Sequence, residues 1–322
     1  MSFVKRFSSV LSSLFGFILL CVILSCLSEH FLTFDNFISV FRQGAGLSLV
    51  AIGMTFCIIS GGIDLSVGSV MAFAGCSAGI LMSYGMNWML ACCIGLLAGA
   101  LLGLVMGVLI SRVRLQPFIV TLVIMSFSRG LALVFTNGQP VFGFPREFRF
   151  LGTHILWGVL PVPVLISIIA FIVTAFILKE TNFGINVYAV GSSYDSALYS
   201  GINVKKTVTL VYTLSGFLSA AAGIILTSRV NSGQPILGEG MELDAIASVV
   251  IGGTAMSGGQ GGIVGTIIGT LIILFLRNGL NLMAVSAFWQ KVVIGIVILV
   301  AVLVDKYQQS LREKRSALAM NK

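Results

Sequence analysis

Long apolar runs separated by short polar segments dominate the 322-residue chain. Most runs are about 16 to 24 residues long, and a helix needs about 20 apolar residues to cross a bilayer. We therefore predict an all-α polytopic membrane protein whose residues 1–322 form a single transmembrane domain. The ten predicted crossings are Val10–Leu27, Gly44–Ile59, Val67–Met82, Trp88–Ile110, Phe118–Phe135, Ile155–Leu178, Val208–Thr227, Ala245–Met256, Ile263–Leu282 and Phe288–Val304.

Composition supports the membrane class and removes several others. Hydrophobic residues make up 57% of the chain and charged residues only 9%, whereas soluble domains carry about 25% charged residues. The net charge of +8 does not indicate a nucleic-acid partner, because the basic residues lie between apolar runs and at the termini, where they would meet membrane lipids. The six cysteines all lie in apolar runs and the two histidines are far apart, so we predict no metal site and no cofactor.

The distribution of Lys and Arg predicts the orientation. With the N-terminus inside, most of the 19 basic residues fall on the inner side. Both termini, the tail 305–322 and the loop 179–206 are then cytoplasmic, and the first apolar run is an uncleaved helix rather than a signal peptide. If Ala245–Met256 were a re-entrant hairpin instead, the basic tail would lie outside.

Two distant stretches share one pattern. Ser60–Ser69 reads SGGIDLSVGS and Ser257–Thr266 reads SGGQGGIVGT, so both fit S-G-G-x-x-x-x-V-G-[ST] and both open a new apolar run near the inner side. Glycine lets the backbone leave the helix, and paired Gly-interrupted segments are typical of broken helices at a transporter's substrate path. The predicted helix-break glycines are Gly61, Gly62, Gly68, Gly258, Gly259 and Gly265.

Asp64 is a carboxylate within the first of these stretches. Asp64 or Ser66 can cap the helix that begins near Val67, which makes Asp64 a structural residue. It can equally contact the translocation path. Because an intramembrane acid is a candidate ion site, an ion-coupled secondary transporter that uses Asp64 is the alternative function.

Four stretches in order resemble the permease subunit of ribose-type monosaccharide ABC importers, within the branched-chain-amino-acid/ribose permease superfamily. They are SGGIDLSVGS, Pro117–Val141, SGINVKK (Ser200–Lys206) and Val249–Gln290, and the resemblance covers nearly the whole chain.

The resemblance implies a permease of the bacterial inner membrane that forms a homodimer or pairs with a close paralogue. It implies a periplasmic sugar-binding protein that delivers a monosaccharide, such as a ribose-like pentose, and a cytoplasmic ATP-binding subunit that drives alternating access. No G-x-x-x-x-G-K-[ST] occurs in the chain, so we expect it not to be an enzyme itself. The sequence does not name the sugar, and no catalytic constellation indicates a membrane-embedded enzyme.

In this family the inner loop after the sixth helix carries the coupling helix that docks in the ATPase. The stretch Gly191–Val204 corresponds to it, although one of the usual paired alanines is a serine and Tyr199 replaces an expected basic residue. An ordinary solvated loop is the alternative. The predicted coupling residues are Asp195, Ser196, Ala197, Ser200, Gly201 and Ile202.

Polar residues in or beside apolar runs are candidates for the sugar path, since sugars need hydrogen-bond partners. Each can instead form a helix–helix hydrogen bond. We expect Arg129 to snorkel or pack and Arg277 to snorkel to the outer surface or meet the binding protein. The candidates for the path are Asp64, Ser66, Asn137, Asn278, Asn281 and Gln290, of which Asn278 and Asn281 share a helix face.

Overall fold

The computed structural model describes residues 3–320, with side chains for residues 11–303, 306 and 307. Thirteen α-helices make up almost all of this range, which confirms the all-α class. The elements are α1 Phe3–Leu27, α2 Phe34–Ile59, α3 Val67–Ser83, α4 Trp88–Arg112, α5 Pro117–Thr136, the 3-10 helix η1 Arg146–Arg149, α6 Phe150–Thr153, β1 Ile155–Leu156, β2 Leu160–Pro161, α7 Val162–Glu180, α8 Asn182–Ser192, α9 Tyr194–Tyr199, α10 Val204–Val230, α11 Met241–Ile251, α12 Ile263–Leu282 and α13 Ala287–Met320.

Six of the described helices are long and apolar enough to cross a membrane, namely α2, α4, α5, α7, α10 and α12. Three shorter apolar helices accompany them, at Leu11–Leu27, Val67–Ser83 and Ala287–Leu303. The chain is thus a multi-pass membrane protein. Helix α11 has 11 residues, which at about 1.5 Å per residue covers roughly half of a bilayer.

Several predicted boundaries were wrong by four residues or more. Helix α11 runs from Met241 to Ile251, whereas the predicted span was Ala245–Met256. The span predicted at Ile155 starts as a β-hairpin, because Trp157 (φ 51°) and Gly158 (φ 74°) form a left-handed turn, and α7 begins only at Val162. Helix α2 begins at Phe34 rather than Gly44. Its first turns contain polar residues that hide the apolar pattern, and one of them, Asn36, is bonded to Asn278 of α12.

The centre of the bundle consists of α2, α3 and α10, whose side chains are mostly buried. Helix α4 packs against α10 through Gly99, Gly103 and Gly107, where an added Cβ would meet α10 at Gly216, Tyr212 and Thr209. Small residues at four-residue intervals let two helix backbones approach closely without any hydrophobic driving force in lipid. The three glycines form a Gly-x-x-x-Gly-x-x-x-Gly pattern in the sequence of α4.

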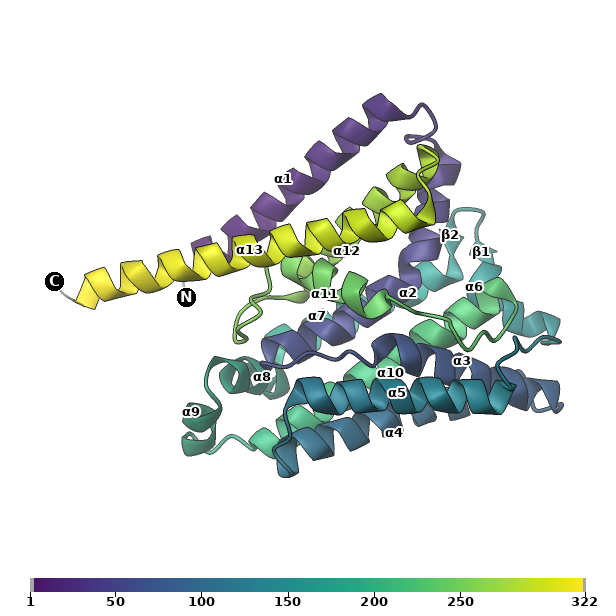
Figure 1. Cartoon of the computed structure of the whole chain (residues 1–322), viewed down its shortest axis with the longest axis horizontal. Coiled ribbons are helices and arrows are strands. Elements are labelled where there is room, and N and C mark those ends of the chain that lie inside the picture. The colour runs from purple at the N-terminus through teal and green to yellow at the C-terminus, as the bar shows by residue number, and fades with distance from the viewer. Residues whose placement is uncertain (1–2, 321–322) are drawn as a thin grey trace.

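Both described ends of the chain lie at one end of the molecule, together with α8 and α9 (Figure 1). The hairpin β1–β2 and α6 lie at the opposite end (Figure 1). The described ends of the chain and the helices of the loop 179–206 thus lie at the same end of the molecule, and that this end is cytoplasmic stays a prediction. The structure does not describe the side chains of Lys5, Arg6 and most of the tail 305–322.

Candidate functional site: two glycine breaks and a charged pair

The first break separates α2 from α3 over residues 60–66. Helix α2 ends at Ile59 and is followed by Gly61 at φ 87°, and the Gly62 N–H donates to the Cys57 carbonyl at 2.9 Å. A Cβ on Gly62 would meet the Tyr212 hydroxyl and Pro117. Glycine is therefore needed at both positions, once for its backbone conformation and once for close packing.

Asp64 holds the first break together from within. Its Oδ1 accepts from the Ser66 N–H at 2.9 Å and from the Ser66 hydroxyl at 2.6 Å, and its Oδ2 accepts from the Ser215 hydroxyl of α10 at 2.7 Å. The side chain is fully buried. Both carboxylate oxygens thus have donors from the protein, as buried polar groups require.

The second break runs from residue 252 to residue 262 and is longer than the first. Helix α11 ends at Ile251, several residues before Ser257, and the N–H of the following Gly253 (φ 86°) donates to the Val250 carbonyl. The starts of the following helices correspond to within one residue, since α3 begins at Val67 and α12 at Ile263, directly before Val264, the counterpart of Val67. The repeat therefore holds for the helix starts but not for the helix ends.

The glycines of the repeat have two distinct roles. Gly258 (φ 82°) and Gly259 (φ 69°) adopt left-handed conformations in the second loop. Gly68 and Gly265 lie in the first turns of α3 and α12, where each faces a backbone carbonyl of a neighbouring segment, that of Gly238 for Gly68 and that of Gly252 for Gly265. Gly68 and Gly265 therefore have equivalent packing roles in the two motifs.

The two breaks meet each other at α8. The Gly259 N–H donates to the Ile59 carbonyl at 2.8 Å, which joins the second loop to the end of α2. Gly191 of α8 lies between them, because an added Cβ there would meet both the Ile59 carbonyl and the Gly259 nitrogen. The Tyr188 hydroxyl of α8 donates to the Gly261 carbonyl at 2.8 Å. Helix α8 thus contacts both breaks at once.

Helix α9 follows directly and contains three of the six predicted coupling residues. Asp195, Ser196 and Ala197 lie on it, with Ala197 buried and the other two exposed. Ser200, Gly201 and Ile202 form the turn to α10, in which Gly201 has φ 79° and open space around it. The exposed surface of α9 also includes Leu198 and Tyr199, the latter 88% exposed.

The predicted path residues do not form one site. Asp64 and Ser66 are bonded within the first break. Asn278 and Asn36 exchange two hydrogen bonds of 3.1 and 2.8 Å between α12 and α2, and Gln290 donates to Asn281 at the turn into α13. Asn137 lies apart, as the left-handed cap of α5.

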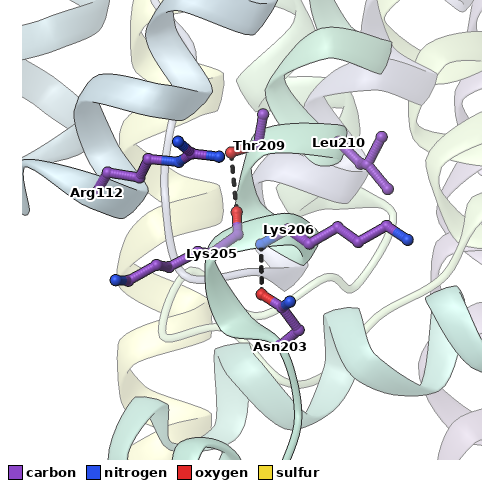
Figure 2. A pocket seen from close by; sticks show the side chains of 6 residues that line it. All are labelled: Arg112, Asn203, Lys205, Lys206, Thr209 and Leu210. Atoms are coloured by element: carbon purple, nitrogen blue, oxygen red, sulfur yellow. Dashed lines mark hydrogen bonds between the residues drawn. The ribbon is translucent and has the colours of Figure 1, made fainter.

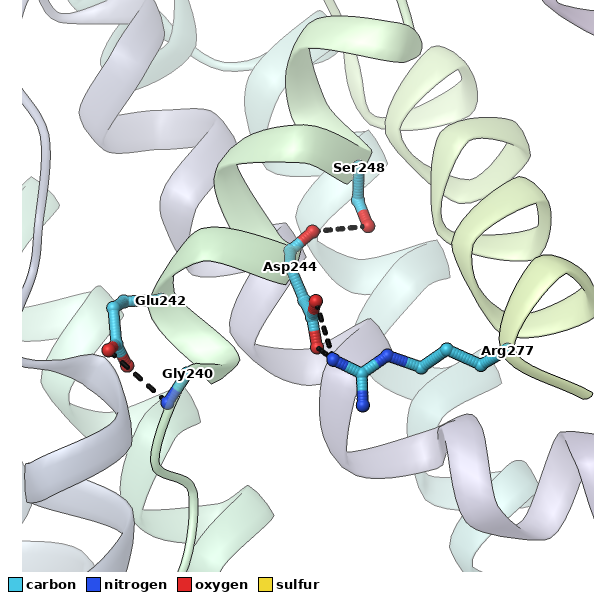
Figure 3. Close-up of polar contacts among 5 residues, drawn as sticks. All are labelled: Gly240, Glu242, Asp244, Ser248 and Arg277. Carbon is cyan, nitrogen blue, oxygen red and sulfur yellow. Dashed lines mark hydrogen bonds and ion pairs between the residues drawn. The ribbon is translucent and has the colours of Figure 1, made fainter. Parts of the chain in front are cut away.

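A charged pair that we did not predict joins α11 to α12. Arg277 lies against the carboxylate of Asp244, with N–O distances of 2.8 and 2.6 Å, and Asp244 is only 3% exposed (Figure 3). Arg277 thus has an ion-pair partner within the bundle, and the expectation that it reaches the outer surface or the binding protein stays a prediction. Gly252 meets Gly265 and Ser248 meets Gly269, so Asp244 lies near the middle of α12.

Other charged groups surround this pair. Glu242 accepts from the Gly240 N–H at 3.3 Å (Figure 3). Arg129 donates to the carbonyls of Pro235 and Leu237 at 2.6 and 2.9 Å and thereby holds the segment before α11, which fits the expected packing role. The sequence does carry a signal for this group, since Glu242 and Asp244 directly precede the apolar run that begins at Ala245, and Arg277 lies within the run Ile263–Leu282.

Comparisons with known proteins now identify the family. Residues 36–302 match the model described as branched-chain amino acid transport system / permease component. The chain belongs to this permease family. It is 44% identical over 308 residues to the ribose import permease protein RbsC of Haemophilus influenzae, covering 94% of this chain and 95% of the relative.

Further relatives agree with this assignment. The permease is 46% identical over 293 residues to the ribose import permease protein RbsC of Bacillus subtilis, covering 90% of this chain and 91% of the relative. It is 39% identical over 280 residues to the D-allose transport system permease protein AlsC of Escherichia coli, covering 86% and 85%. No solved structure matches the chain. The permease is a multi-pass subunit of a bacterial ABC importer, in which the ATPase is a separate protein.

Proposed function

We propose that the permease translocates a monosaccharide, with ribose as the first candidate, across the bacterial inner membrane. The similarity to ribose import permeases along more than nine tenths of the chain supports this substrate. The buried carboxylate of Asp64 argues against the ion-coupled alternative, because three donors from the protein already occupy it. In this proposal Asp64 and Ser66 organise the first break.

The proposed topology has ten crossings and cytoplasmic termini. The six long and three shorter apolar helices supply nine of them. The tenth consists of the segment 231–240 followed by α11. Gly233 pairs with Val141 of the loop after α5, whereas Gly238 reaches Gly68 at the start of α3, so the segment descends alongside the bundle before α11 begins.

The proposed mechanism is alternating access driven from α8 and α9. The cytoplasmic ATP-binding subunit docks on α9, and its movement reaches both breaks because α8 contacts the Ile59 carbonyl and the second loop. The breaks are the places where helices lack continuous backbone hydrogen bonds, so they bend at least cost. A periplasmic binding protein delivers the sugar, and a second permease copy or close paralogue completes the path.

We further propose that the charged pair of α11 and α12 lines this path. Charged residues within membrane segments mark substrate pathways by default. The Arg277 side chain is 41% exposed, so part of it can meet a sugar, while the ion pair with Asp244 holds the guanidinium in position.

Reconstituted uptake tests the whole proposal. The permease is inserted in liposomes with its ATP-binding subunit and binding protein, and uptake of radiolabelled ribose, allose and arabinose is measured. We expect ribose uptake that needs internal ATP and persists when ionophores collapse the membrane potential and proton gradient. Uptake that stops with the ionophores, or that favours another sugar, would contradict the mechanism or the substrate respectively. Arg277→Lys should raise the KM for the sugar, whereas the exposed control Arg146→Lys should not.

Gly201 tests the docking surface. Gly201→Val forces a β-branched residue to φ 79° in the turn after α9, which costs on the order of 1–2 kcal/mol and distorts the turn. We expect severalfold lower recovery of the ATP-binding subunit in co-purification. Gly143→Val is the matched control, since Gly143 also has a positive φ and open surroundings but lies in the loop after α5. Equal recovery with both variants would place the dock elsewhere.

A further inference from the structure

A cavity of about 480 Å³ lies where the end of α4 meets the start of α10. Its walls come from Arg112 of α4 and from the residues around the first turns of α10, Asn203, Lys205, Lys206, Thr209 and Leu210 (Figure 2). None of the residues assigned above to the breaks, the charged pair or α9 lines it. The cavity is therefore a feature separate from the proposed path.

The lining of this cavity is strongly cationic. It contains three basic side chains and no acidic one, and the ion pairs of the described residues involve neither Arg112 nor the two lysines. The α10 N-terminus adds partial positive charge, which Asn203 neutralises in part by accepting from the Lys206 N–H at 3.0 Å. Figure 2 shows Arg112 and Lys205 on one side of α10 and Lys206 extending on the other. An anion is the matching ligand.

Tight packing between α4 and α10 keeps these cations together. Gly107 lies against the backbone of Thr209, and the hydroxyls of Ser111 and Thr209 are 3.0 Å apart. The helix ends cannot separate without losing these contacts. The packing of α4 against α10 thus fixes the backbone positions of Arg112, Lys205 and Lys206 relative to one another.

The cavity also adjoins exposed apolar helix surface. Leu210, which lines it, is 42% exposed, and Phe217, two turns further along the same face of α10, is exposed to the same extent. On α4 the exposed residues Leu104 and Val105 lie two turns before Arg112. Basic side chains at the end of a lipid-facing apolar stripe lie at the level of the phospholipid headgroups, and basic pockets between helices at this level bind anionic lipids.

We propose that this cavity binds the phosphodiester headgroup of an anionic phospholipid. Arg112 and Lys205 contact the phosphate, and the acyl chains follow the stripe of Leu210 and Phe217. An anionic lipid fits better than a soluble phosphate because the cavity continues into apolar surface. Since α10 begins directly after α9 and its turn, the bound lipid anchors the start of α10 beside the proposed dock.

Native mass spectrometry of the full chain tests the proposal. The protein is taken from nanodiscs that contain phosphatidylglycerol and phosphatidylcholine, and retained lipids are counted for wild type and for Arg112→Gln/Lys205→Gln. Each lost charge near a membrane surface weakens binding by roughly fivefold, so we expect about 25-fold weaker phosphatidylglycerol binding. Lys179→Gln/Lys306→Gln removes the same charge outside the cavity and should keep wild-type binding. Thermal unfolding in pure phosphatidylcholine checks that both variants fold.

Three outcomes would overturn the proposal. The first is equal retention of phosphatidylglycerol by both double variants. The second is competition by millimolar inorganic phosphate, which would make the cavity a site for soluble anions. The third is unchanged lipid retention by Arg112→Gln/Lys205→Gln together with loss of the ATP-binding subunit in co-purification, which would make the cavity part of a protein dock.

Discussion

The two glycine breaks begin from one sequence pattern and are stabilised in different ways. The first is short and fixed by its own residue, because Asp64 accepts three hydrogen bonds from Ser66 and Ser215. The second has Gly261 at the position of Asp64, and the Tyr188 hydroxyl of α8 donates to its carbonyl. The first break is thus held by a side chain of its own that bonds to α10, whereas the second is held by a side chain of α8 and should follow the movement of that helix.

This difference suggests separate roles in transport. In the proposed mechanism both breaks bend, but the first bends less because Asp64 bonds it to α10, and the second responds more strongly when the ATP-binding subunit moves α8. The hydrogen bond from the Gly259 N–H to the Ile59 carbonyl is the contact that this movement changes. Variants that affect one break at a time distinguish these roles.

The largest effect is expected for Asp64→Ala. The change removes the acceptor of three buried donors, and each unsatisfied donor costs about 1–3 kcal/mol, so the loss of stability should be about 3 kcal/mol or more. The measurement is thermal unfolding in detergent. Asp35→Ala is the control, because Asp35 is exposed at the start of α2 and should change little. Similar melting of the two variants would show that Asp64 does not fix the first break.

Gly191→Ala should have an intermediate effect that involves both breaks. The new methyl group would overlap with the Ile59 carbonyl and the Gly259 nitrogen, and overpacking of this kind costs about 1–3 kcal/mol. We expect uptake to fall about tenfold while ATP hydrolysis by the assembled complex continues. The ATP-binding subunit still docks on α9, but α8 no longer passes its movement to the breaks. Gly130→Ala is the control, since nothing lies within 4 Å of a Cβ there. Full uptake by Gly191→Ala would show that the contact of α8 with the two breaks is not needed for transport.

Tyr188→Phe should have the smallest effect and should be confined to the second break. It removes one donor to the Gly261 carbonyl, a loss of about 1 kcal/mol. Hydrogen exchange should become about fivefold faster at residues 257–262 and stay unchanged at residues 60–66. Tyr199→Phe, at the exposed surface of α9, should alter neither segment. Equal acceleration in both loops would mean that the breaks are stabilised as one unit.

The hydrophobic pattern predicted most of the fold because membrane spans are local features. Helices α3, α4, α5 and α12 begin and end within two residues of their predicted spans. The errors arose where local chemistry overrides hydropathy, as in the left-handed turn before α7, or where polar residues such as Asn36 are satisfied by a distant helix.

The candidate site was only partly predictable. The repeated glycine pattern located both breaks. The sequence did not show that α11 ends at Ile251, several residues before the second motif begins at Ser257. Asn278 and Asn281 were good candidates by spacing, yet each already has a polar partner in the structure. Asp244 and Arg277 were visible as charges, but each had several conceivable partners along the chain.

By itself the sequence determined the membrane class, the number of apolar runs and the resemblance to sugar permeases, because these depend on composition and on motifs that are contiguous in the chain. Only the tertiary structure decided that Gly259 reaches Ile59, that Gly191 lies between the breaks and that Asp244 meets Arg277. These contacts join residues far apart in sequence, where hydrogen-bond capacity alone leaves many equivalent pairings. The packing of glycine-rich helix surfaces selects one of them.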